Sequence, residues 1–132
     1  MNKTLILGFI LFGGIAHAES GASLCEKHNR ADYLNECNQI ITGKNYDANA
    51  IALCSNHNRA DYLNSCLKIT ANKSYDETAR ALCSLHNRAD YLNECLEISG
   101  NIRFGENVSE LCGRHNRADY LNSCLVSSGG NK

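Results

Sequence analysis

Apolar residues recur along the chain in short clusters at helical spacing, each cluster close to a cysteine. In the segment 47–57 this cluster consists of Ala50, Leu53 and Cys54, followed one turn later by His57. Spacings of three and four residues place such side chains on one side of a helix. Asp47 stands where the helix would begin, and Asp76 holds the equivalent place in the next copy of the pattern. Because aspartate is a preferred N-cap residue, the pattern predicts a short helix over about 47–57.

A second helix is predicted directly after the first. Its apolar face consists of Tyr62, Leu63, Cys66, Leu67 and Ile69 or Thr70. Asn58 is the expected N-cap, with Asp61 three residues later as an acidic variant of the capping box. The expected C-terminal ends are Gly43, Asn72 and Asn101, which are residue types that accept a left-handed backbone. Strict alternation of apolar and polar residues never persists, so strands are not expected.

This two-helix pattern repeats every 29 residues. The octapeptide HNRADYLN occurs four times without change, starting at His28, His57, His86 and His115, and the connecting segments differ from one another. A fixed period of this size is typical of a repeat protein, whose units bury their apolar faces by stacking. We therefore predict an all-α fold of four disulfide-stapled helical hairpin repeats of 29 residues that form a short α-solenoid. The expected repeats span about 19–46, 47–75, 76–104 and 105–132.

Residues 1–18 have the pattern of a signal peptide. Lys3 gives a positive start, an apolar run follows, and Ala16 to Ala18 form a small-x-small cleavage site. The apolar run is too short for a membrane span, which takes about 20 residues. We expect export to the periplasm or secretion, and a mature domain of residues 19–132 without a membrane span.

The charge of the chain disfavours a nucleic-acid partner. Lys3 is the only charged residue of the segment 1–18, so the remaining chain carries 12 basic and 14 acidic side chains. Nucleic-acid binding normally requires a basic face, and the same balance disfavours electrostatic binding to a membrane.

An even number of cysteines in an exported chain indicates a disulfide framework. The eight cysteines are Cys25, Cys37, Cys54, Cys66, Cys83, Cys95, Cys112 and Cys124. Pairing within each repeat uses all eight. A ladder between repeats (Cys37 with Cys54, Cys66 with Cys83, Cys95 with Cys112) is also geometrically possible, but it leaves two cysteines unpaired. We favour the pairing within repeats.

Two other chemistries compete for the cysteines. Cys54-x-x-His57 with Cys66 nearby resembles a metal site, but each repeat offers three such ligands and zinc usually takes four. A Cys–His nucleophile of a hydrolase or redox enzyme is the other alternative, although a catalytic site is normally single. We expect no catalytic residue, no metal site and no cofactor.

The histidines and arginines of the octapeptide are the candidate binding residues. A structural role would make each histidine a hydrogen-bonded helix-end residue, and each arginine the partner of an aspartate in its own or a neighbouring repeat. In a solenoid, however, equivalent residues line up as rows that serve as binding faces. The candidates are His28, His57, His86, His115, Arg30, Arg59, Arg88 and Arg117. Such an edge would suit a protein segment or an anionic ligand.

The chain is similar in its logic to the disulfide-stapled Sel-like helical repeat proteins of bacteria, in which each hairpin carries its own cysteine pair. The period of 29 and the cysteine spacing found here differ from theirs. The resemblance therefore implies a fold and no functional residue. Our functional expectation is an exported protein-interaction or scaffold module, with a metal-binding protein and a small secreted hydrolase or redox enzyme as alternatives.

Overall fold

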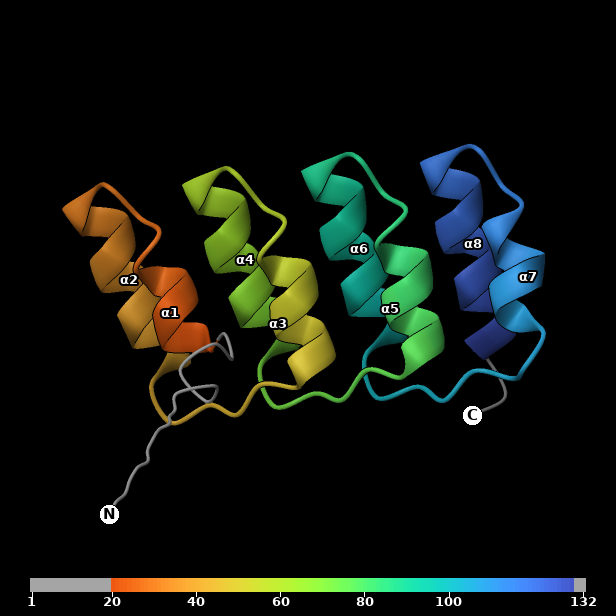
Figure 1. Cartoon of the computed structure of the whole chain (residues 1–132), viewed down its shortest axis with the longest axis horizontal. Coiled ribbons are helices and arrows are strands. Elements are labelled where there is room, and N and C mark those ends of the chain that lie inside the picture. Colours follow the sequence, from red (N-terminus) through yellow and green to blue (C-terminus); the bar gives the residue numbers. More distant parts are fainter. Residues whose placement is uncertain (1–19, 130–132) are drawn as a thin grey trace, which may run out of the picture.

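The computed structural model describes residues 20–129, and within that range the chain forms eight helices and no strand. The helices are α1 (Gly21–Cys25), α2 (Ala31–Ile41), α3 (Ala48–Cys54), α4 (Ala60–Thr70), α5 (Glu77–Cys83), α6 (Ala89–Ser99), α7 (Val108–Gly113) and α8 (Ala118–Gly129). They pair as four hairpins, which we number 1 to 4 in chain order and which stand side by side in one row (Figure 1). The predicted all-α repeat fold is confirmed.

Each hairpin is closed by its own disulfide bond. The pairs are Cys25–Cys37, Cys54–Cys66, Cys83–Cys95 and Cys112–Cys124. The Cα atoms of each pair lie 5.5 or 5.6 Å apart, which is an ordinary disulfide separation. Pairing within repeats is therefore confirmed, and the alternative ladder between repeats is wrong.

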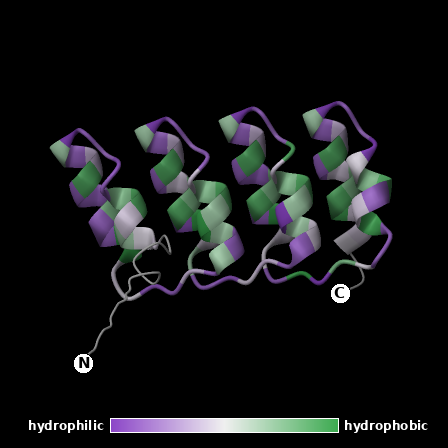
Figure 2. Ribbon diagram, viewed as in Figure 1, coloured by the Kyte–Doolittle hydropathy of each residue, from purple (hydrophilic) through white to green (hydrophobic). Residues whose placement is uncertain are grey.

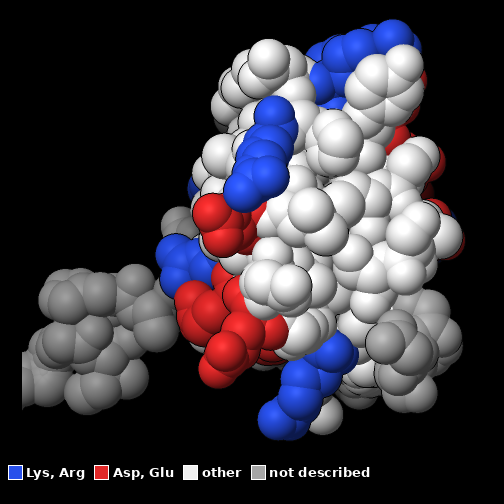
Figure 3. Space-filling model, turned by 90° about the vertical axis from the view of Figure 1, so that its right-hand side faces the viewer, with Lys and Arg blue, Asp and Glu red and all other residues white. Residues whose placement is uncertain are grey.

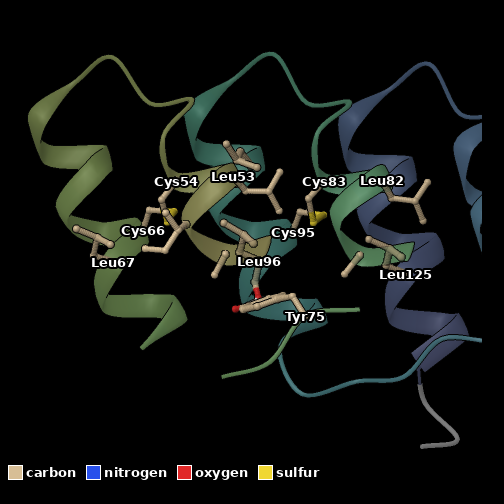
Figure 4. Packing of buried hydrophobic residues seen from close by; sticks show 14 of the residues in the cluster. Leu53, Cys54, Cys66, Leu67, Tyr75, Leu82, Cys83, Cys95, Leu96 and Leu125 are labelled. Carbon is tan, nitrogen blue, oxygen red and sulfur yellow. Dashed lines mark hydrogen bonds between the residues drawn. A yellow bond between two sulfur atoms is a disulfide. The ribbon is translucent and has the colours of Figure 1, made fainter. Parts of the chain in front are cut away.

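The core between successive hairpins is formed largely by leucines. The leucine before the first cysteine of a hairpin is buried in hairpins 1 to 3 (Leu24, Leu53 and Leu82), whereas Leu111 of hairpin 4 is exposed. These leucines therefore face the next hairpin. The leucine after the second cysteine is fully buried in hairpins 2 to 4 (Leu67, Leu96 and Leu125) and faces the preceding hairpin. Figure 4 shows five of these leucines (Leu53, Leu67, Leu82, Leu96 and Leu125) together with the disulfides of hairpins 2 and 3. Figure 2 shows the apolar residues concentrated on the helices.

The first helix of each repeat is shorter than its sequence pattern indicates. Asp47 and Asp76 are N-caps as predicted, but α3 ends at Cys54 and not at His57. Beyond Cys54 the backbone tightens into i to i+3 hydrogen bonds, of which one joins the His57 N–H to the Cys54 carbonyl at 3.1 Å. This tighter turn leads the chain out of the helix and into the octapeptide.

The prediction that Asn58 caps the second helix is wrong. The N-cap of α4 is Arg59, which has an extended backbone and makes no side-chain capping bond. Asp61 takes over the capping task because its Oδ1 accepts the backbone N–H of Tyr62 at 2.9 Å. An acidic residue in the first turn is also favoured by the helix dipole.

The predicted helix ends are confirmed as tight turns. Gly43, Asn72 and Asn101 have positive φ angles of 74°, 62° and 63°. After α2, for example, the Lys44 N–H donates to the Ile41 carbonyl across Gly43, which is the hydrogen bond of a β-turn. The residue before Gly43 is extended at φ −61° and ψ 123°, so the turn is of type II, which needs a left-handed third residue.

None of the helices within residues 20–129 combines the length and apolarity that crossing a membrane requires. The predicted signal peptide, residues 1–18, lies outside the described residues.

Candidate functional site

The octapeptides lie along one edge of the stack, where each forms the loop between the two helices of its hairpin and the start of the second helix (Figure 1). Successive octapeptides bind to each other. The histidine Nε2 of one octapeptide hydrogen bonds to the final asparagine Oδ1 of the next, and these pairs are His28–Asn64 at 2.7 Å, His57–Asn93 at 2.7 Å and His86–Asn122 at 2.8 Å. The first residue of the motif thus contacts the last residue of the following copy.

The final asparagine is held by a second bond, which sets the direction of the first. Asn93 Nδ2 donates to the backbone carbonyl of Tyr62 at 3.3 Å, so its Oδ1 faces His57. His57 must therefore be the donor through its Nε2–H. Asn64 and Asn122 bond to Tyr33 and Tyr91 in the same way. The octapeptide is thus a self-complementary junction between neighbouring hairpins.

The arginine column is exposed and locally paired. Each arginine forms an ion pair with the aspartate two residues later, at 2.7 Å in all four copies. Its guanidinium carbon also lies 4.3–4.9 Å from the ring centre of the tyrosine of the same octapeptide. The structure therefore places the expected Arg–Asp pairs within each repeat and not between repeats. Exposed pairs of this kind contribute about 0–1 kcal/mol to stability.

The second residue of the octapeptide was missed as a functional candidate. The four copies are Asn29, Asn58, Asn87 and Asn116. All are exposed, and none forms a side-chain hydrogen bond in the part of the chain that the structure describes. Because an asparagine before a helix is typical of an N-cap, the sequence pattern indicated a structural role for these four residues. Its side chains are free to bind a partner.

Three equivalent grooves lie between the four octapeptides. Each is lined by His, Asn and Arg of one copy and by His, Asn, Arg, Ala and Leu of the next. The volume of each groove is about 220 Å³. The leucines are Leu63, Leu92 and Leu121, which are nearly fully buried and form an apolar floor. The candidate histidines, arginines and the free asparagines are thus brought together, although the buried His57 serves mainly the junction.

Burial lowers the pKa of His57 below its ordinary value of 6.5, against the opposing effects of the Asn93 hydrogen bond and the nearby Asp61 carboxylate. The unfolded chain therefore binds a proton in a pH range where folded His57 does not. In this window, between the lowered folded pKa and 6.5, the free energy of unfolding rises with pH and falls on acidification.

We predict that His57→Gln flattens the dependence of the free energy of unfolding on pH in the window below 6.5, because glutamine can still donate to Asn93 but does not titrate. Urea unfolding at several pH values measures the slope. His115→Gln is the matched control, since His115 is exposed and has no asparagine partner within residues 20–129. Equal slopes for wild type and His57→Gln would contradict the prediction.

The cysteines are not available for metal binding or nucleophilic chemistry. All eight sulfur atoms are in disulfide bonds, and a bonded sulfur is neither a thiolate ligand nor a nucleophile. Across residues 20–129 there is also no group of three His, Cys, Asp or Glu side chains arranged to hold a metal ion. Four disulfides indicate an oxidising environment.

The chain matches no known protein family, no curated protein and no solved structure.

Proposed function

We propose that this protein is an exported binding module that holds an extended polypeptide along its octapeptide edge. The observation that carries the proposal is the row of three equivalent grooves, bordered by asparagines that the fold does not use. The disulfides and the signal-peptide pattern of residues 1–18 support a function in the periplasm or outside the cell.

The chemistry of the edge suits a peptide backbone better than an anion. An asparagine side chain offers both a donor and an acceptor, and so it matches the N–H and C=O of a peptide bond. Each arginine charge is already balanced by an aspartate at 2.7 Å, so the edge has no unpaired row of positive charge. A protein segment is therefore favoured over an anionic ligand such as an acidic glycan.

The spacing of the grooves also suits an extended chain. Packed helices lie about 8–10 Å apart, so successive grooves repeat at about that distance. A fully extended strand advances about 3.3 Å per residue, but its side chains alternate between two sides, so residues three apart would not face the same way. A polyproline II segment has three residues per turn and a rise of about 3.1 Å per residue, so every third residue would meet a groove. The apolar leucine floor of each groove would accept a small apolar side chain.

We predict that Asn58→Ala combined with Asn87→Ala weakens peptide binding about 10-fold or more and leaves stability unchanged. Each replacement removes hydrogen bonds to the ligand worth about 0.5–1.5 kcal/mol and none within the fold. The probes are fluorescent 12-residue peptides with leucine, valine or proline at every third position and serine elsewhere, measured by fluorescence polarisation.

The control variant is Asn38→Ala, which removes an exposed asparagine of α2 that does not line any of the three grooves. It should bind the peptides like the wild type. If the double variant also binds like the wild type, the asparagine column is not the site. If none of the peptides binds but a heparin oligosaccharide does, the partner is anionic and the proposal is wrong.

A further inference from the structure

We propose that the two ends of the stack bind each other between molecules, so that copies of this chain assemble head to tail. The inference uses the end faces of hairpins 1 and 4 and is independent of the proposed peptide binding. It follows from the self-complementary octapeptide, because a motif that joins each hairpin to the next leaves one unused half at each end of the part that the structure describes, residues 20–129.

The exposed end of hairpin 4 carries the first half of a junction. Leu111 is 52 % exposed, whereas its equivalents in the other hairpins are at most 2 % exposed because the next hairpin covers them. Tyr120 is also 52 % exposed, whereas the tyrosines of the other three octapeptides are partly buried. His115 has no asparagine acceptor within residues 20–129. Hairpin 4 thus presents the same groups that hairpins 1 to 3 use to bind their successors.

The opposite end, on hairpin 1, carries the second half. Asn35 is exposed, whereas its equivalents Asn64, Asn93 and Asn122 are buried against the preceding hairpin. Leu34 is only partly buried, whereas the equivalent leucines are 3 % or 4 % exposed. A hairpin placed before hairpin 1 would complete both residues in the way that the internal junctions do.

The two ends are therefore complementary by the rule seen three times inside the molecule. Across the proposed interface His115 would donate to Asn35 of the next copy, and Asn35 would donate to the Tyr120 carbonyl. Leu111 would become buried as Leu82 is now. Figure 3 shows the hairpin 4 end: uncharged side chains fill its centre, and charged side chains lie towards its margin. Charged residues are usually depleted at the centre of a protein interface and kept at its polar rim.

One substitution makes the intermolecular junction weaker than the internal ones. Asn38 occupies the position that Leu67, Leu96 and Leu125 hold in the other hairpins, where the leucine faces the preceding hairpin and is fully buried. The terminal junction therefore lacks one leucine, which favours reversible assembly that depends on concentration. Because the two surfaces differ, the contact is heterologous and extends into a filament or closes into a ring. Each contact would add one more groove of the same kind and continue the octapeptide edge from molecule to molecule.

The test uses one variant blocked at each end. Leu111→Lys places a charge on the hairpin 4 face, and Asn35→Arg places one on the hairpin 1 face. Both residues are partly or fully exposed, so folding is preserved, and circular dichroism and a free-thiol count check this. Val126→Lys is the matched control, since Val126 is 57 % exposed in the same hairpin at a position that is exposed in every repeat. Mass is measured by sedimentation velocity on the exported protein over a 100-fold range of concentration.

The mass of the particles formed by the wild type and by Val126→Lys should increase with protein concentration. It should either pass the mass of a dimer, as a filament would, or reach the mass of one closed ring. Each end-blocked variant alone should stay monomeric, whereas an equimolar mixture of the two should form a 1:1 dimer through its two free ends. Three results overturn the proposal: a monomeric wild type at every concentration, assembly of either blocked variant alone like the wild type, or a mixture that stays monomeric.

Discussion

Replacing Cys54 and Cys66 together by alanine is expected to lower the free energy of unfolding by about 3 kcal/mol. The bond closes a loop with a sequence separation of 12, and opening a loop of this size restores entropy to the unfolded chain worth about 3 kcal/mol. Hairpin 2 contacts a neighbour on both sides, because α4 packs against α2 and against α6. Loss of the disulfide in hairpin 2 therefore weakens two junctions. Urea unfolding followed by circular dichroism measures the change.

The matched variant removes Cys112 and Cys124 from hairpin 4, which has one neighbour within the described residues. In a one-dimensional array only nearest neighbours are coupled, so this loss should loosen hairpin 4 and leave the remaining hairpins protected from hydrogen exchange. Loss of the hairpin 2 bond should instead reduce protection on both sides of the break. Equal exchange patterns for the two variants would show that the stack does not behave as an array of coupled hairpins.

The fold could be predicted because its determinants are local. The determinants include the buried pair Leu53 and Cys54, the N-cap aspartate at position 47 and the turn glycine at position 43. Each of them influences the backbone only within one or two helical turns. Pairing of Cys54 with Cys66 was favoured because, unlike the ladder between repeats, pairing within repeats leaves no cysteine unpaired in an oxidising compartment. The errors were at element ends, where the i to i+3 turn before His57 competes with helix continuation.

The junction could not be predicted because it depends on how neighbouring hairpins are aligned. His57 and Asn93 are 36 residues apart and come together only when hairpins 2 and 3 stack with one particular offset. The available signal was the invariance of both residues in all four copies, but the same invariance is shared by the exposed Asn58. Only the structure separates the positions that hold the stack together from those that are free for a partner.

The second large effect is expected at the final residue of the octapeptide. Asn93→Ala should lower the free energy of unfolding by about 1–3 kcal/mol, because it leaves the buried Nε2–H of His57 without an acceptor. The Tyr62 carbonyl loses a donor at the same time. Urea unfolding measures the loss, at protein concentrations where the wild type is monomeric.

Asn35→Ala is the control that gives this prediction its force. Asn35 occupies the same position of the same octapeptide in hairpin 1, but its side chain is exposed and makes no hydrogen bond within residues 20–129. Its replacement should change the free energy of unfolding by less than about 0.5 kcal/mol, as is usual for an exposed site. A helix-propensity effect of alanine would be the same at both positions, so a difference between them isolates the bond to histidine. If the two variants lost equal stability, the His–Asn pairs would not hold the stack together, and the four identical octapeptides would need another explanation.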